Sequence, residues 1–479
     1  MKVLPPAWAG ADEEAWQQLG CPTCAEQEHE LERLRRENER LRRRLTEIEA
    51  DLECAQRAGK RQAAPFSKGK GRSSGRRPGR RPGEAYGQKA YRAVPKLVDR
   101  EVEVGVPSAC PHCGGAVREQ HTADQYQEEL PAARAVVTRF HVHVGRCDQC
   151  GRRVQGRHPE QTSDALGAAG VQLGPRAEAL AVQLNKTVGA SMAKTAAVVQ
   201  QVGGIAVTAG GISQVLDRVG RRATPTYEAL LEAIRHSPVV APDETGWKVG
   251  GQLQWLWAFV GDKVTVYRIQ AGRGFGEAAS VLGKSFAGVL ERDGWAPYRQ
   301  FTQATHQTCT AHLLRRCHDL LETARGGARC FPLAVKHLLQ EAVELRTRRT
   351  AGQMPPVELD AAIQALEDRA DALLAEHIQQ PDNRRLQKHL TNERQALFTH
   401  LKHDGVEATN WRAEQAIRPA VVNRKVWGGN RTPNGAQTQQ VLVSLLRTCW
   451  QQARDPTSVL VALLRSPTPA VAPFDLPRG

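Results

Sequence analysis

Two aspartates close short apolar segments in the second half of the chain, where a strand would end. Val239–Asp243 is the first segment, and Ala287–Asp293 is the second. A single aspartate at such a position is commonly a turn or capping residue. Two carboxylates at the ends of neighbouring strands, however, suit a pair of Mg²⁺ or Mn²⁺ ions. Such ions activate water against a phosphodiester and stabilise the leaving oxygen, and carboxylates must hold them.

The elements around these aspartates follow an order that would bring them together. Gln252–Val260 and Val264–Ile269 have the composition of two further strands, and a helix is expected over Gly276–Gly283. Three antiparallel strands, a helical crossover and a fourth strand begin a ribonuclease-H-like domain, with carboxylates at the ends of the first and fourth strands. We therefore expect an α/β catalytic domain over residues 236–430.

Longer motifs surround the two acids and recur toward the C-terminus. Together they resemble the motifs of the insertion sequence 66 family of bacterial DDE transposases, and the N-terminal modules described below follow the order found in that family. The resemblance therefore covers nearly the whole chain. The segments that carry it are Asp243–Trp247, Asp293–Tyr298, His306–His312 with Arg315 and Arg316, Asn410–Pro419 with Arg424 and Lys425, and Ser444–Thr448 before Asp455.

This resemblance implies a catalytic triad of Asp243, Asp293 and Glu414 that holds Mg²⁺ or Mn²⁺. It also implies cleavage and strand transfer of double-stranded DNA at terminal inverted repeats, with accessory transposition proteins as further partners. Glu414 would lie on a helix that begins near Thr409 or Asn410, both suitable N-caps. Glu291, Asp404 and Glu407 are nearby rivals, and Glu291 shares a strand face with Asp293.

A helical insertion is expected at about residues 318–402, between the second and third acids. Apolar residues recur there at helical spacing. They are Leu359, Ile363, Leu366, Ala370 and Leu373.

Two CxxC pairs predict a structural zinc site within residues 101–160. Cys110 and Cys113 form one pair, and Cys147 and Cys150 form the other. Each pair lets two thiolates converge on one tetrahedral ion, and strand-like segments such as Val136–Val144 would join them, as in a zinc ribbon. Four thiolates leave no open coordination position, which favours a structural role over a catalytic one. A third pair, Cys21 and Cys24, has no obvious second half and supports no metal prediction. Cys309 and His312 form a CxxH motif, for which support of the active-site helix is preferred over zinc binding.

Residues 25–56 are expected to form a coiled coil. Between Leu31 and Leu52, apolar residues and Asn38 alternate three and four apart, which is an a/d seam. In a parallel pair, Glu30 would face Arg35 and Glu37 would face Arg42, both attractive. The expectation is a homodimer; a solitary amphipathic helix is the alternative.

The chain is basic, and the excess is concentrated. Its formal net charge is +15, and 12 Lys or Arg fall within residues 57–92 against the single Glu84. This segment belongs to a Pro- and Gly-rich linker, expected to be disordered over residues 57–100, which favours a polyanionic partner. The cations expected to contact DNA are Arg76, Arg77, Arg80, Arg81, Arg315, Arg418, Arg424 and Lys425, with solvated helix charge as the alternative for those near the acids.

Residues 161–235 are expected to be helical. Ser191–Val202 would end at Gly203 and Gly204, and a second helix would start near Thr208. This pattern fits a helix-turn-helix DNA reader and an ordinary helical hairpin equally well. Residues 431–479 would form a C-terminal helical tail. Four tryptophans lie near the motifs, and core packing is preferred over stacking on an unpaired base for each: Trp247, Trp295, Trp411 and Trp427.

In sum, we expect a multidomain α+β protein. No secretory signal and no run of about 18 apolar residues is found, so the cytoplasm is the expected compartment. Two other functions stay open: a catalytically silent DNA-binding regulator derived from a transposase, and a structure-selective nuclease that cuts without joining.

Overall fold

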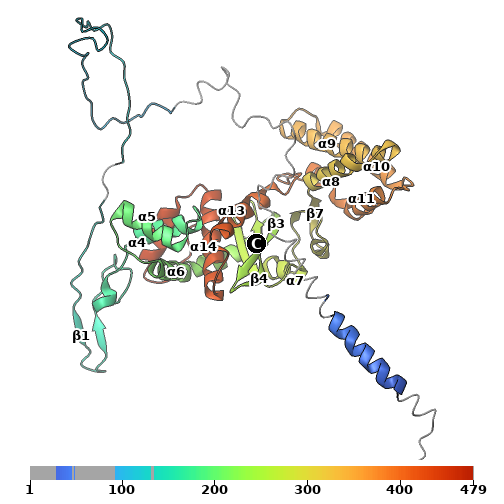
Figure 1. Cartoon of the computed structure of the whole chain (residues 1–479), viewed down its shortest axis with the longest axis horizontal. Helices are drawn as coiled ribbons and strands as arrows, with labels where there is room; N and C mark the ends of the chain where they lie inside the picture. Colours follow the sequence, from blue (N-terminus) through green and yellow to red (C-terminus); the bar gives the residue numbers. More distant parts are fainter. Residues whose placement is uncertain (1–28, 46–47, 49–91, 131–133, 478–479) are drawn as a thin grey trace, which may run out of the picture. The chain divides into compact units, whose positions relative to one another are not determined.

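The computed structural model describes residues 29–45, 48, 92–130 and 134–477 (Figure 1). The chain divides into two units, Met1–Val94 and Pro95–Gly479, and each is described by itself. Within the described residues, no helix is both long and apolar enough to cross a membrane.

In the first unit, residues 29–45 are helical. Arg33 and Arg36 pair with Glu30 and Glu32 across one turn, at 2.6 and 2.8 Å. The leucines of the predicted seam project into solvent, and Leu41, for example, is 56% exposed. Arg76, Arg77, Arg80 and Arg81 lie outside the described residues, as do Cys21 and Cys24.

The second unit begins with an irregular segment that carries the two CxxC pairs. Its strands are short: β1 (Val144–Arg146) pairs with β2 (Arg153–Gln155) in antiparallel register. The strand predicted over Val136–Val144 is wrong for most of its length, because regular structure begins only at Val144. Val136 is 91% exposed, so it has no sheet or helix on which to pack. An apolar alternation without a partner surface does not produce a strand.

Helices follow the irregular segment, and the predicted helical pair is confirmed. After the short η2 (Gly167–Gly170) come α4 (Pro175–Lys186), α5 (Met192–Gly203) and α6 (Ala209–Arg235). Ser191 caps α5 through its side chain, and Thr208 caps α6 in the same way. Gly204 ends α5 in the left-handed region, at φ 66°.

A five-stranded sheet forms the centre of the second unit, in the order β5-β4-β3-β6-β7. Three antiparallel strands come first, and the helix α7 (Phe275–Leu282) leads to β6, which runs parallel to β3. This confirms the predicted order of meander, helical crossover and fourth strand. The strands are β3 (Val239–Val249), β4 (Gln252–Val260), β5 (Thr265–Gln270), β6 (Val289–Arg292) and β7 (Thr305–Thr308).

Both faces of the sheet are covered by helices, and β4 shows how the sequence achieves this. Leu256, Ala258 and Val260 face α13 (Trp411–Trp427), whereas Trp257 and Phe259 face the core formed with α6 and α14 (Pro433–Gln451). Successive strand residues point to opposite faces, so a continuous apolar run serves two cores. The short helix α15 (Pro456–Arg465) packs into the same core as α6 and α14.

Helix α14 also closes the free edge of β5 with side chains. Ser444 Oγ accepts a hydrogen bond from Tyr267 N at 2.8 Å, and Gln440 and Thr448 accept from Ile269 N and Thr265 N at 3.0 and 3.2 Å. Four residues span about 6 Å along a helix, and two residues span about 6.8 Å along a strand. The acceptors on α14, four residues apart, therefore match the backbone N–H donors of β5, two residues apart. The helix thus covers an edge that would otherwise offer unpaired groups to another chain.

Further helices lie between the second and third acids: α8 (Thr310–Thr323), α9 (Cys330–Thr350), α10 (Pro356–Ala375) and α11 (Pro381–Glu393). Their apolar residues form a cluster separate from the two cores of the sheet. Shorter turns accompany them, η3 (Ala296–Gln300), η4 (Gly326–Arg329), η5 (Arg394–Ala396) and α12 (Thr399–Lys402).

Candidate active site and metal-binding segments

The first two acids lie at equivalent positions of two parallel strands. Val240 of β3 is in register with Leu290 of β6, and this is the last pair between the two strands. Asp243 and Asp293 each lie three residues further on, where the strands separate. Beyond its last β6 partner, β3 continues as a hairpin with β4, so Asp243 lies within β3 and not at its end, where it was expected.

The third acid approaches from the first turn of α13. Asn410 precedes this helix, and its Nδ2 donates to Pro242 O at 3.0 Å, directly before Asp243. Asn410 N also donates to Cys309 Sγ at 3.3 Å, at the start of α8. These two bonds fix the beginning of α13 against β3 and α8. Glu414 lies in the first turn that they anchor.

Asp243 lies close enough to the other two acids for their charges to act on it. Burial, the charge of adjacent Glu244 and the charges of Asp293 and Glu414 raise the pKa of Asp243 from 3.8 to about 7. A buried carboxyl group beside other acidic side chains forms a place where a divalent cation would relieve the repulsion. In the described residues, no three His, Cys, Asp or Glu side chains converge on one point closely enough to coordinate an ion. Asp243 thus lies near the other two acids, but the three side chains do not converge on one point.

The hydrogen-bonded contacts of Glu244, the residue after Asp243, were not predicted from the sequence. The side chain of Glu244 is only 2% exposed and receives hydrogen bonds from Arg273 Nε and from Tyr298 Oη, the latter at 2.8 Å. Burial raises the pKa of Glu244, and the bond from Arg273 opposes that rise. The one sequence signal for these contacts was that Glu244 and Tyr298 belong to the motifs that carry the two aspartates.

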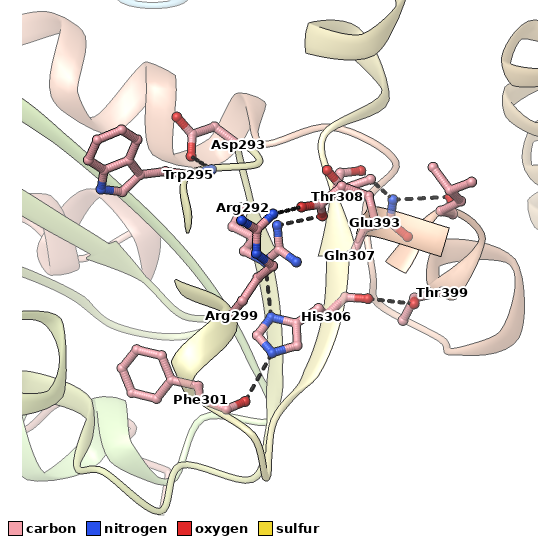
Figure 2. Close-up of polar contacts among 11 residues, drawn as sticks. Arg292, Asp293, Trp295, Arg299, Phe301, His306, Gln307, Thr308, Glu393 and Thr399 are labelled. Atoms are coloured by element: carbon pink, nitrogen blue, oxygen red, sulfur yellow. Dashed lines mark hydrogen bonds and ion pairs between the residues drawn. The ribbon is translucent and has the colours of Figure 1, made fainter. Parts of the chain in front are cut away.

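Another buried ion pair connects the strand before Asp293 to the helices that follow the sheet (Figure 2). Arg292 Nη1 lies 2.6 Å from Glu393 Oε2, and Arg299 Nη1 lies 2.9 Å from Glu393 Oε1. Arg292 Nε also donates to His306 Nδ1 at 3.0 Å. The side chains of Arg292 and Glu393 are 2% and 0% exposed. The last residue of α11 is thus bound to the residue that immediately precedes the second acid.

The rival acids have other partners. Glu291 is buried, and its Oε1 accepts a hydrogen bond from Glu407 N at 2.6 Å. Burial raises the pKa of Glu291 to about 7. Glu407 pairs with Arg346 at 2.6 Å, and Asp404 pairs with Arg349. These contacts give the three rivals structural roles beside the site.

The CxxH motif lies at the start of α8, beside the third acid. His312 Nε2 is 3.8 Å from Glu414 Oε1, and Cys309 is buried beneath Asn410. The motif therefore contacts the beginning of α13, which fits the expected role in supporting the active-site helix.

The cations expected to contact DNA fall into two groups. Arg315, Arg418 and Lys425 are exposed, on α8 and α13. Arg424, in contrast, is half-buried and donates to Thr245 Oγ1 at 2.8 Å and to Gly246 O. Burial lowers the pKa of Arg424. Arg424 thus ties α13 to β3, two residues beyond Asp243.

The two CxxC pairs adopt the same local structure. Cys110 N donates to Gly115 O at 2.8 Å, and Cys147 N donates to Arg152 O at 2.9 Å. Gly114 and Gly151 follow the second cysteine of each pair at φ 74° and 66°, a conformation that glycine adopts without strain. Hydrogen bonds from the backbone of His112 and Cys113 lower the pKa of Cys110, and those from Cys150 and Gln149 lower the pKa of Cys147.

These turns suit thiolate ligands, because their backbone N–H groups already favour the charged form of the thiol. The two pairs are not brought to a common point in the described residues. Each half of the predicted zinc site is therefore formed locally, and the convergence of the halves stays a prediction.

Comparison with known proteins agrees with this arrangement. The model of the transposase IS66 family matches residues 170–438, more than half of the chain and including all three acids. The chain therefore belongs to the IS66 transposase family. It is also similar to an uncharacterised protein, y4qI, of Sinorhizobium fredii, with 24% identity over 283 residues, 53% of this chain. The match spans 52%, about half, of the length of that relative.

Proposed function

We propose that this chain is a DNA transposase that binds the terminal inverted repeats of its element and performs strand cleavage and strand transfer. The observation that carries the proposal is the approach of Asp243, Asp293 and Glu414 from three elements, β3, the end of β6 and the first turn of α13. The sheet order of an antiparallel meander followed by two parallel strands supports a ribonuclease-H-like catalytic domain.

The residues present fit two divalent cations. Carboxylate oxygens are the ligands that Mg²⁺ and Mn²⁺ prefer, and the mutual repulsion around Asp243 favours bound positive charge. When bound, such ions lower the pKa of water and stabilise the leaving oxygen of a phosphodiester. Asp243, Asp293 and Glu414 would hold the ions. Glu244, held by Arg273 and Tyr298, would keep the strand carrying Asp243 in place.

Other parts of the chain would bind and pair the DNA ends. The exposed cations Arg315, Arg418 and Lys425 lie on the helices that carry His312 and Glu414, where they would contact phosphates. The exposed leucines of residues 29–45 support dimerisation through a coiled coil. The matched CxxC turns support a structural zinc ion held by Cys110, Cys113, Cys147 and Cys150.

The test is strand cleavage and joining on DNA that carries the element's own ends, in Mg²⁺, with wild type, Asp293→Asn and Asp262→Asn. Asp262 is an exposed residue of the turn between β4 and β5, so its variant should behave as wild type. Asp293→Asn should abolish both steps and leave DNA binding nearly intact. Wild-type binding without cleavage would favour the regulatory alternative, and cleavage without joining would favour the nuclease.

A further inference from the structure

The four tryptophans near the motifs divide into two kinds. Trp247 is 1% exposed, and Trp427 packs against it edge to face, at 5.8 Å between ring centroids. These two belong to the core, as predicted. Trp295 and Trp411 are 38% and 51% exposed, against the expectation of core packing. Trp295 lies two residues after Asp293, and Trp411 lies three residues before Glu414.

Trp295 is the outer layer of a stack of planar groups. The guanidinium of Arg273 lies 4.3 Å from the ring centroid of Trp295 and 5.0 Å from that of Trp255. Arg273 is in turn bound to Glu244, which directly follows Asp243. The stack Trp255–Arg273–Trp295 therefore starts on β4 and ends beside the acids. Cation–π contacts of this kind order the aromatic ring that takes part in them.

The position of Trp295 is fixed by further contacts. Its Nε1 donates to Arg273 O at 3.3 Å, and its backbone N donates to Asp293 Oδ1 at 3.0 Å (Figure 2 shows Trp295 beside Asp293). Gly294, between the two residues, has φ 34° and passes so close to His389 of α11 that a Cβ would lie 2.8 Å from its ring. The turn thus needs glycine, and it directs the indole back toward Arg273. An exposed indole is held in one orientation next to a catalytic acid.

We infer that Trp295 is a stacking platform for an unpaired nucleobase of the DNA end that is being cut. This inference rests on the proposed function, because it assumes that DNA lies at Asp293. Trp295 is 38% exposed although Arg273 stacks on its ring, and every nucleobase has a π-face that can stack on an indole. A base stacked on Trp295 would place its own phosphodiester next to Asp293, two residues away. The platform would therefore select frayed or unpaired ends by their bases, without reading a sequence.

The experiment measures binding of the full chain, in Ca²⁺, to three labelled duplexes that carry the element's end. One duplex is blunt, one ends in three unpaired nucleotides, and one has the same unpaired end with abasic sites. Wild type should bind the unpaired end about 10-fold more tightly than the abasic end, within the range expected for one stacked base. Trp295→Ala should remove this difference, and Trp295→Phe should restore most of it.

Trp450→Ala is the matched control. Trp450 is 68% exposed and stacks on Arg447 at 4.0 Å, like Trp295 on Arg273, but it lies on α14. This variant should keep the wild-type preference for bases. Equal abasic penalties in wild type and Trp295→Ala would overturn the inference while leaving the transposase proposal intact. Failure of wild type to bind any of the three duplexes would instead contradict the proposed function.

Discussion

None of the described residues between 92 and 160, where the cysteine pairs lie, is buried, whereas Leu256–Val260 of β4 are all buried. Both regions carry a metal site predicted from the sequence. In the sheet region, three elements with extensive cores bring Asp293 and Glu414 near Asp243. In the cysteine region, each pair is organised only by its own turn. The fold by itself thus brings the acids near one another, whereas the turns by themselves do not bring the two cysteine pairs together in the described residues.

The largest effect should come from Asp243, the acid whose pKa burial and neighbouring acids raise. Asp243→Asn keeps the shape of the side chain and removes a charge proposed to hold metal ions, so cleavage should fall by at least roughly 100- to 1,000-fold, as for loss of a group that stabilises the transition state. A strand-cleavage assay in Mg²⁺ measures this. Retained cleavage by this variant would show that the sheet does not build the metal site.

Zinc removal should affect the other region alone. Zinc binding contributes roughly 10 kcal/mol to the folding of small zinc domains. Cys147→Ala with Cys150→Ala should abolish zinc binding, measured by metal analysis, and raise hydrogen exchange over residues 92–160. The urea transition of the sheet region should not change. Cys330→Ser, at an exposed cysteine of α9, is the control; zinc retained by the double variant would refute the predicted site.

Loss of the buried ion pair between Glu393 and Arg292 should have the next largest effect, on the free energy of unfolding. Glu393→Gln leaves Arg292 buried without its counter-charge, so stability should fall by about 3–5 kcal/mol. Glu341→Gln breaks the exposed pair with Arg369, where both side chains are about half exposed, and should cost at most about 1 kcal/mol. Urea unfolding of both variants gives the comparison. Equal losses of stability in Glu393→Gln and Glu341→Gln would mean that the buried pair between α11 and β6 stabilises the protein no more than an exposed pair does.

A smaller effect concerns pH. The pKa of Asp243 is raised from 3.8 to about 7, so the folded protein retains a proton that the unfolded chain loses. The metal-free protein should therefore lose stability as pH rises from about 4 to about 7, by on the order of 3 kcal/mol after screening at this half-buried site. Asp243→Asn should lack this loss and be the more stable protein at pH 8. Parallel stability curves for the two proteins from pH 4 to 8 would contradict the raised pKa.

The smallest effect tests how the sheet is closed. Ser444→Ala removes the acceptor for Tyr267 N at a buried edge, which should cost about 1–2 kcal/mol. Chemical denaturation measures the loss, and Ser213→Ala, at an exposed position of α6, should cost almost nothing. A neutral result at Ser444 would mean that water replaces the helix at this edge.

The sequence was most informative where a pattern repeats within one element. The ends of α5 to within one residue, the start of α6, the bounds of β4 and the order of meander, crossover helix and fourth strand follow from local spacing and were predicted correctly. Strand β3 was predicted to end at Asp243 and instead continues to Val249. Its second half, with Glu244 and Lys248, is too polar to look like a strand, and only pairing with β4 makes it one.

The sequence alone predicted which residues would carry the chemistry: three acids within family motifs, and two cysteine pairs, each followed by a glycine. The tertiary structure decided which groups serve them. Arg424 faces β3, Glu393 reaches Arg292 across 101 residues, and Trp295 stays exposed although tryptophan usually packs inside. The physical reason is that a charge or an aromatic ring is useful in many places. The role of such a side chain is fixed only when distant elements place a partner against it or leave it exposed to solvent.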